Sequence, residues 1–396
     1  MFVLTYDIII RIQMPSKIKV LQVIPKLGYG GAETGCYDIA HYLHEKDFGS
    51  YVVTSGGDLL KYVDKKKVKI IRLPVHSKNP LLILINAIIL SLIIIFLNIN
   101  IVHARSRAPA WSCYFATRIT RRKFVTTFHG TYNFKSPIKK FYNSVMLKSD
   151  LIICGSNFIF SHIYENYKDY IHNKKLLVIF RGINLEYFNS KNVEEEKENR
   201  LLSEHSLDKS KKIILLPGRL TAWKGQEMFI EAIKNLKLIR PDILFTAVLL
   251  GNDQGRKIYK KKLQRLVEQY RLVNDVKFIE HIKHMPSIYN LSHIVISSSI
   301  EPEAFGRVSV EGQAMEKIVI ASNIGGSNET IVDKKSGYLF EAGNSEDLLK
   351  KLIFAIDLDF ETANKIKDDA RNNVIRKFDV EKMCFSTYSE YKKLLN

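Results

Sequence analysis

The sequence predicts an α/β protein of two domains, each a doubly wound parallel β-sheet covered by helices. The chain has 396 residues, which is more than one hydrophobic core usually holds. Short runs rich in β-branched and aromatic residues alternate with longer helical stretches, a pattern typical of parallel sheets. The apolar content of 46% and the charged content of 26% are those of a folded protein, which argues against global disorder.

The first domain is expected over residues 14–188. Residues 1–13 are interpreted as a leader, and not as a signal peptide, since they lack the basic beginning and the small-residue cleavage site of one. Met14 is the alternative first residue. The strands expected in this domain are residues 20–24, 52–57, 68–73, 99–102, 124–128 and 151–154.

The seventeen residues 81–97 carry no charge and resemble a membrane span. As a helix they would extend about 25 Å, slightly less than the roughly 30 Å of a hydrocarbon core. They also lie between two expected strands of one sheet, so crossing a bilayer would separate the halves of that domain. We therefore expect a crossover helix with an apolar outer face, which binds a membrane surface without spanning it.

The second domain is expected over residues 211–377, after a charged linker at 189–210. Residues 378–396 form an amphipathic helical stretch at the end of the chain. The strands expected in this domain are residues 213–216, 245–250, 276–279, 294–298, 318–322 and 338–340.

Two motifs of the second domain carry groups that suit a nucleotide sugar. In the first, Arg219 and Lys224 follow a strand and precede a helix, which suits a diphosphate, because the helix start adds amide donors to their charge. In the second, Glu303 and Glu311 are eight residues apart, and Gly325, Gly326 and Glu329 follow. A carboxylate beside a turn can accept hydrogen bonds from sugar hydroxyls. Taken singly, a solvated basic loop or a chance pair of glutamates remains an alternative.

Together these motifs resemble the Glu-x7-Glu pattern of family 4 glycosyltransferases, which are retaining enzymes of the GT-B fold. The resemblance implies that Glu303 holds hydroxyls of the transferred sugar, that Glu311 holds the ribose, and that the last helix crosses back to the first domain. The remaining donor-binding residues implied by the resemblance are Arg219 and Lys224 at the diphosphate, the turn Phe305, Gly306 and Arg307, and Glu329 as a secondary contact.

The first domain contains two further elements of the same resemblance. Gly30 and Gly31 resemble the glycine-rich loop that lies over the reacting centre at the interdomain cleft, although a plain strand-to-helix turn is the alternative. A dinucleotide-binding reading fails, because Glu33 stands where the third glycine belongs. His129, directly after a strand, resembles the active-site histidine of the family. His103 ends another strand, but a lone histidine is usually structural.

Segments around residues 78–80, 103–111 and 126–131 resemble bacterial glycosyltransferases of lipopolysaccharide core assembly. This resemblance implies a nucleotide-sugar donor, a glycolipid or lipopolysaccharide-type acceptor, and a peripheral place on the cytoplasmic face of the inner membrane. It also implies no cofactor and no metal, and the one Asp-x-Asp, at Asp357 and Asp359, is interpreted as two surface carboxylates.

The net charge of +19 draws the chain to polyanions, but the sequence has no nucleic-acid-binding signature, so we expect no nucleic-acid partner. Four scattered cysteines indicate reduced thiols in a cytoplasmic protein. A non-catalytic protein that binds sugar nucleotides, or a basic nucleic-acid-binding protein, are the alternative functions.

One departure from the family pattern concerns backbone geometry. Glu316 and Ile318 stand where a glycine and a proline are expected after the motif helix. Glu316 is therefore predicted to need a positive φ, which is unfavourable for a residue with a Cβ.

Overall fold

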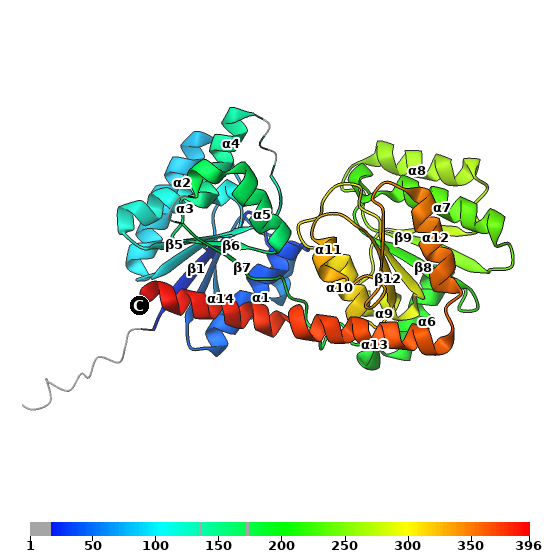
Figure 1. The fold of residues 1–396 in the computed structure, drawn as a ribbon. Coiled ribbons are helices and arrows are strands. Elements are labelled where there is room, and N and C mark those ends of the chain that lie inside the picture. The colour runs from blue at the N-terminus through cyan, green and yellow to red at the C-terminus, as the bar shows by residue number, and fades with distance from the viewer. Residues whose placement is uncertain (1–16, 133, 135, 172–173) are drawn as a thin grey trace, which may run out of the picture. The chain divides into compact units, whose positions relative to one another are not determined.

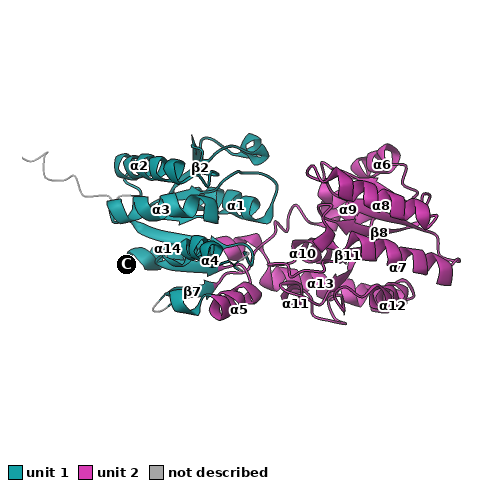
Figure 2. Ribbon diagram, turned by 90° about the horizontal axis from the view of Figure 1, so that it is seen from above, with its two compact units in different colours: residues 1–153, 167–177, 386–396 teal, residues 154–166, 178–385 magenta. Residues whose placement is uncertain are grey.

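The computed structural model describes residues 17–132, 134, 136–171 and 174–396, so the expected leader and Met14 lie outside the described residues. The chain divides into two compact units (Figure 2). Unit 1 comprises residues 1–153, 167–177 and 386–396, and unit 2 comprises residues 154–166 and 178–385. Unlike the predicted limits at 14–188, this division groups 154–166 and 178–188 with unit 2.

Unit 1 contains a seven-stranded sheet with the order β3-β2-β1-β4-β5-β6-β7 (Figure 1). The chain reverses direction of winding between β1 and β4, which pair in parallel, and ligands of such sheets lie beyond the carboxyl ends of strands at this point. The strands are β1 Lys19–Val23, β2 Gly49–Thr54, β3 Val68–Arg72, β4 Ile101–Ala104, β5 Lys123–Phe128, β6 Leu151–Cys154 and β7 Lys175–Val178. The helices of this unit are α1 Gly31–Glu45, α2 Pro80–Phe96, α3 Arg107–Thr120 and α4 Pro137–Ser144, and the next helix along the chain, α5 Asn157–Asn166, belongs to unit 2.

Unit 2 contains a six-stranded sheet with the order β10-β9-β8-β11-β12-β13. The pairs on both sides of β8 and of β12 are parallel. The strands are β8 Lys212–Pro217, β9 Phe245–Leu250, β10 Val276–Ile279, β11 Ile294–Ser297, β12 Ile318–Ser322 and β13 Tyr338–Phe340. The helices are α6 Glu195–Glu204, α7 Gln226–Ile239, α8 Lys257–Gln269, α9 Met285–Leu291, α10 Arg307–Ala314, α11 Ser327–Thr330, α12 Ser345–Ile356, α13 Phe360–Lys377 and α14 Val380–Leu395.

The predicted fold class is confirmed, and every strand expected from the sequence is present. The strand that was not predicted is β7, at the edge of the unit 1 sheet. Its residues Leu176, Leu177 and Val178 form an apolar run, so this signal was available in the sequence, although the folded strand is only exposed or half-buried.

The uncharged stretch is the crossover helix α2 between β3 and β4, as predicted. Asn79 caps its first turn by accepting hydrogen bonds from the backbone N–H groups of Leu81 and Leu82, at 2.9 and 3.4 Å. Leu90 and Ile94 on the inner face are fully buried, whereas the outer face is exposed. Across the described ranges, the structure contains no helix that is both long enough and apolar enough to cross a membrane.

Residues 189–210, expected as a linker, contain helix α6. Leu201 on this helix is buried in the core of unit 2, and Asn290 Nδ2 donates a hydrogen bond to Glu198 Oε1 at 2.8 Å. The charged face seen in the sequence is therefore the outer face of a packed helix.

Helix α14 has residues in both units: it starts in unit 2, and its part from Ser386 onward belongs to unit 1. In unit 1 the fully buried Tyr391 hydroxyl is 2.5 Å from Nδ1 of His103, at the carboxyl end of β4. The end of the chain thus completes the core of the unit that the beginning of the chain builds.

Candidate active site

The first pair of predicted site residues that the structure brings together is Lys224 and Glu303. The Lys224 ammonium lies 2.6 Å from Glu303 Oε1, and both side chains are only about one tenth exposed, at 12% and 11%. Lys224 is in the loop after β8 and Glu303 is in the loop after β11. Because β8 and β11 are parallel neighbours, their carboxyl ends meet at one edge of the sheet.

The carboxylate of Glu303 is held in its charged form. Burial raises the pKa of Glu303, but the Lys224 charge and hydrogen bonds from Lys224, Ser299 and Ser297 lower it more, so that the pKa lies below its ordinary value. The Ser299 hydroxyl donates a short hydrogen bond to the same Oε1. The site therefore presents a fixed anion and a fixed cation side by side.

Two adjacent glycines fix the Glu303 loop. Gly325 has φ 62°, and a Cβ on it would come within 2.7 Å of the Glu303 carbonyl oxygen. A Cβ on Gly326 would come within 2.6 Å of the Phe305 Cα, while the Gly326 N–H donates to the Glu303 carbonyl at 2.7 Å. The two loops therefore pack backbone against backbone, which explains why glycine occupies both positions.

The second motif carboxylate, Glu311, lies on α10 and is buried. Its Oε1 accepts a hydrogen bond from Arg307 Nε at 2.6 Å, and its Oε2 accepts one from the Tyr289 hydroxyl at 2.8 Å. Burial, followed by the Glu311 charge, raises the pKa of Tyr289 well above its ordinary value, so this hydroxyl stays protonated as a donor. Each carboxylate oxygen has two lone pairs, which leaves capacity for further hydroxyl donors.

Helix α10 has a residue with positive φ on either side of it. Gly306 precedes its first residue with φ 91°, and no side chain caps the helix there. After its last turn, Glu316 has φ 55°, so the predicted strained geometry is confirmed. The Glu316 carboxylate accepts a hydrogen bond from the Ser190 hydroxyl, which helps to hold this unfavourable conformation.

Two other predicted donor residues, Arg219 and Phe305, have distinct environments. Arg219 is exposed, and Nη1 donates to Gln254 Oε1 at 3.4 Å. The Phe305 ring is buried against Phe378, with 5.5 Å between the ring centroids, so Phe305 offers a ligand its backbone alone.

The Glu329 side chain binds the start of helix α5. Its Oε2 accepts hydrogen bonds from the backbone N–H and the side-chain Nδ2 of Asn157, at 2.7 and 2.9 Å, and its Oε1 accepts one from the Phe158 N–H at 2.5 Å. A carboxylate is a favourable partner there, because the first N–H groups of a helix lack intrahelical acceptors. The sequence could not show this contact, since the partners are 172 residues apart.

In unit 1, Gly30 is the N-cap of α1 and Gly31 is its first residue. His129 directly follows β5. Both of its ring nitrogens are buried, and neither has a hydrogen-bond partner within the described ranges. Buried polar atoms are normally paired, so these two nitrogens mark a place where a ligand is expected.

His103 differs from His129 in that both of its ring nitrogens have hydrogen-bond partners. It is fully buried, and its ring nitrogens contact the hydroxyls of Tyr391 and Thr127 at 2.5 and 2.7 Å. Burial, followed by the charge of Arg105, lowers the pKa of His103 well below its usual value. Its neutral ring is a structural element of the core.

The predicted surface carboxylates are confirmed. Asp357 pairs with Arg240, with 2.7 Å between Oδ2 and Nη1, and Asp359 caps α13 by accepting from the Thr362 N–H at 2.8 Å. The described part of the chain contains no group of three or more His, Cys, Asp and Glu side chains placed to hold a metal ion.

Ser299 and Tyr289 contact the two motif carboxylates but were absent from the prediction. The run Ser297-Ser298-Ser299 at the end of an expected strand was an available signal for the first, since polar residues there face a ligand edge. Tyr289 has no such signal, because only the folded sheet brings α9 beside α10.

Comparison with known proteins identifies the family. Residues 29–187 match the model of Glycosyltransferase Family 4, and residues 197–373 match that of Glycosyl transferases group 1. The crystal structure of a glycosyltransferase from Rickettsia africae ESF-5 is 39% identical and superposes with a TM-score of 0.88, over 96% of this chain and 99% of that one.

More distant relatives agree. An uncharacterized glycosyltransferase of Methanocaldococcus jannaschii is 29% identical over 280 residues, or 68% of each chain. The Anabaena protein HepE, solved in complex with UDP and glucose, shares the fold, with 21% identity and a TM-score of 0.80 over 95% of this chain and 99% of that one. The chain therefore belongs to glycosyltransferase family 4: it is a nucleotide-sugar-dependent glycosyltransferase of the GT-B fold.

Proposed function

We propose that the protein transfers a sugar, with retention of configuration, from a nucleoside diphosphate donor to a lipid-linked or lipopolysaccharide-type glycan at the cytoplasmic face of the inner membrane. The observation that carries this proposal is the buried Lys224–Glu303 pair. It sets a cation for the departing diphosphate beside an anion for the sugar hydroxyls, which is the charge distribution that the reaction requires.

In this proposal, Lys224 and the exposed Arg219 bind the diphosphate, and the uncapped start of α10 at Gly306 and Arg307 adds backbone N–H donors. Glu311 accepts the ribose hydroxyls with the lone pairs that Arg307 and Tyr289 leave available. The Glu329 carboxylate acts on the donor indirectly, since it holds the loop that carries Gly325 and Gly326.

The reaction breaks the bond between the anomeric carbon and the diphosphate oxygen. The acceptor hydroxyl forms a new bond to the anomeric carbon on the same face, and its proton passes to the oxygen of the departing diphosphate. Lys224 and Arg219 stabilise the negative charge that grows on the diphosphate. His129 and the Gly30-Gly31 loop are further proposed sugar-binding groups, with the His129 nitrogens, which lack partners among the described residues, as hydrogen-bond partners of the sugar hydroxyls. In this scheme no step requires a metal.

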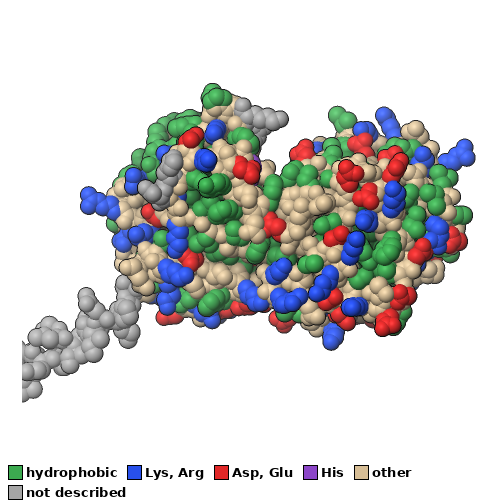
Figure 3. All heavy atoms as spheres, in the orientation of Figure 1, with side chains coloured by type: hydrophobic (Ala, Val, Ile, Leu, Met, Phe, Trp, Pro, Cys, Tyr) green, Lys and Arg blue, Asp and Glu red, His purple; other side chains and the backbone are tan. Residues whose placement is uncertain are grey.

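The outer face of α2 supports the proposed membrane partner. Leu81, Leu84, Ile88, Leu92 and Ile95 recur every three or four residues, and each is 49–66% exposed. Apolar side chains gather over this part of unit 1 (Figure 3). Such a stripe is costly in water and suits the boundary between headgroups and acyl chains.

A basic cluster adjoins the end of α2. It encloses a hollow of about 250 Å³ and is tied to the helix by a hydrogen bond from Arg122 Nη2 to Asn98 Oδ1 at 2.9 Å. Cations beside an apolar stripe favour an anionic lipid surface. The charged residues of the cluster are Arg118, Arg121, Arg122, Lys123, Lys148 and Asp150.

Two measurements test the catalytic proposal. A thermal-shift panel of nucleoside diphosphates and their sugars identifies the donor, and transfer to lipid-linked glycans identifies the acceptor. We expect Glu303→Gln to lower transfer by about 10²–10³, because a buried group that stabilises the reacting sugar is lost. The exposed Glu301→Gln in the same loop is the matched control. Wild-type turnover in Glu303→Gln would remove Glu303 from the site.

Vesicle sedimentation tests the membrane partner. The triple variant Leu84→Ser, Ile88→Ser, Leu92→Ser should lose binding to vesicles that contain anionic lipid, while its melting temperature and its activity on a soluble acceptor stay unchanged. Ile258→Ser, which alters an even more exposed apolar side chain on α8, is the control. Unchanged sedimentation of the triple variant would contradict a role of α2 at the membrane.

A further inference from the structure

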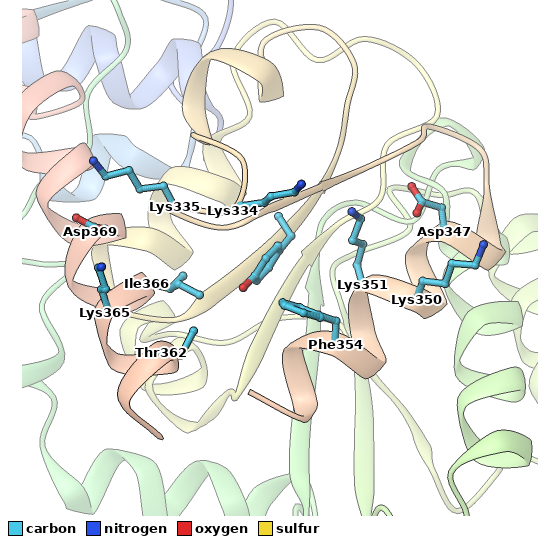
Figure 4. Close-up of a pocket in the computed structure, with 11 residues that line it drawn as sticks. Lys334, Lys335, Asp347, Lys350, Lys351, Phe354, Thr362, Lys365, Ile366 and Asp369 are labelled. Carbon is cyan, nitrogen blue, oxygen red and sulfur yellow. The ribbon is translucent and has the colours of Figure 1, made fainter. Parts of the chain in front are cut away.

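A second cavity lies in unit 2 at the edge of the sheet, between the edge strand β13 and the helices α12 and α13 (Figure 4). Its volume of about 880 Å³ is within the range of roughly 300–1,000 Å³ that is usual for small-molecule sites. It shares no residue with the donor site, whose charged groups follow β8 and β11. The lining residues are Lys334, Lys335, Tyr338, Asp347, Lys350, Lys351, Phe354, Thr362, Lys365, Ile366 and Asp369.

Five of these residues are lysines, and we call the cavity the lysine pocket. Among the described residues none of the five forms an ion pair, whereas lysines elsewhere in the same unit do, such as Lys237 with Asp275. Figure 4 shows Lys335 and Lys365 at one end of the pocket and Lys350 at the other.

Two aspartates also line the pocket, so its charge is positive by three. One Asp347 oxygen already accepts a hydrogen bond from the Glu341 N–H at 2.7 Å. Five ammonium groups around one hollow repel each other, and an anion that enters removes this repulsion.

The floor of the pocket is apolar and aromatic. Phe354 is 55% exposed, and its ring meets that of Tyr338 edge to face, with 5.3 Å between centroids and 75° between planes. Tyr338 holds the ring in place, and the fully buried Leu352 on the same helix anchors α12 to the core. An exposed, oriented ring surrounded by cations is suited to an anion that itself carries a ring.

We propose that the lysine pocket binds an organic phosphate of nucleotide or sugar-phosphate size, with its phosphate groups among the lysines and its ring on Phe354. The lysines supply the charge, and the Phe354 ring selects against bare inorganic anions. This site is independent of the proposed donor site.

The test uses the full chain with 4-fluorophenylalanine in place of Phe354, so that the fluorine resonance reports on this pocket alone. UDP is kept saturating to occupy the donor site, and ionic strength is constant. ATP, glucose 1,6-bisphosphate and inorganic pyrophosphate are titrated in turn. We expect at least one ring-bearing phosphate to bind about tenfold more tightly than pyrophosphate, as one ring contact provides. Tighter binding of ATP would identify the ligand as a nucleotide, and tighter binding of glucose 1,6-bisphosphate would identify it as a sugar phosphate.

The combined variant Lys350→Gln, Lys351→Gln, Lys365→Gln should abolish the resonance shift. The matched control, Lys65→Gln, Lys66→Gln, Lys139→Gln, removes the same charge from exposed lysines of unit 1 and should leave the shift unchanged. Three results would overturn the proposal: no shift with any of the three compounds, equal affinity for all three, or an undiminished shift in the pocket variant. Displacement of ATP by a single-stranded RNA at lower concentration would also overturn it, in favour of a nucleic-acid surface.

Discussion

The two units satisfy the polar groups at their strand ends in different ways. In unit 2 the site carboxylates are paired before any donor binds: Glu303 with Lys224, and Glu311 with Arg307 and Tyr289. In unit 1, His129 after β5 keeps two buried ring nitrogens without partners in the described ranges, while His103 on the neighbouring β4 has both nitrogens paired.

The site carboxylates of unit 2 already have partners when no ligand is bound, whereas the ring nitrogens of His129 are expected to form hydrogen bonds only with a ligand. A buried ion pair costs solvation, so each partner depends strongly on the other. The ring nitrogens of His129 have no hydrogen-bond partner among the described residues, so removal of the ring costs little stability until the ligand binds. Stability and activity should therefore respond differently at the two places.

The largest effect is expected for Lys224→Ala. The Glu303 carboxylate would remain buried without its counter-ion, so we expect a loss of about 3–5 kcal/mol in the free energy of unfolding. Transfer should be undetectable, because the diphosphate also loses a cation. Urea unfolding and a transfer assay measure the two effects. A stability equal to that of the wild type would show that Lys224 and Glu303 do not form an ion pair before the donor binds.

His129→Asn, in contrast, should lower activity without lowering stability. We expect transfer to fall by about a hundredfold, because hydrogen bonds to the reacting sugar are lost. The melting temperature should stay within error, since the His129 ring has no hydrogen-bond partner in the described part of the chain. If the variant unfolds readily, then His129 is a core residue and its difference from His103 disappears.

His103→Phe should destabilise the protein without affecting chemistry. The hydroxyls of Tyr391 and Thr127 would lose their partner, at a cost of about 1–3 kcal/mol. Transfer per folded molecule should be unchanged, as single-turnover assays at low temperature can show. A selective loss of turnover would place His103 in the reaction.

The pH dependence of stability sharpens the contrast further. The folded-state pKa of Glu303 is lowered, so its pairing contributes stability above the unfolded pKa of about 4.3, and this contribution is lost as the pH falls through the folded value. The stability difference between wild type and Glu303→Gln should therefore be full at pH 7 and shrink below about pH 4. An equal stability difference at pH 7 and below about pH 4 would contradict the lowered pKa of Glu303.

The smallest effect is expected for Glu316→Gly. A left-handed conformation costs a residue with a Cβ about 1–2 kcal/mol, and glycine adopts it freely. Loss of the hydrogen bond from Ser190 offsets part of this gain, so we expect a net stabilisation of about 0.5 kcal/mol. Glu316→Ala keeps the strain and removes the hydrogen bond, so it should destabilise and thereby separate the two contributions.

The sequence predicted most of the fold because central parallel strands are buried on both faces and appear as apolar runs. The edge strand β7 was missed although Leu176, Leu177 and Val178 form an apolar run. The site motifs were found where charge and glycine occur at fixed spacing, as at Glu303 and Gly325.

Contacts between distant segments could not be predicted. The Tyr289 hydroxyl reaches Glu311, and Glu329 reaches Asn157, through the packing of loops and helices that no local pattern records. The lysine pocket was hidden for the same reason: the fold brings Lys334 and Lys335 into one pocket with Lys350 and Lys365.

The hydrogen bond between His103 and Tyr391 has a consequence for synthesis. A ribosome releases β4 early, whereas Tyr391 emerges 288 residues later, after all of unit 2. Until then the central sheet of unit 1 contains a histidine without one of its partners, so the first half of the nascent chain stays incomplete. Proteins that lack the last few residues should accordingly fail in the part of the molecule that is made first.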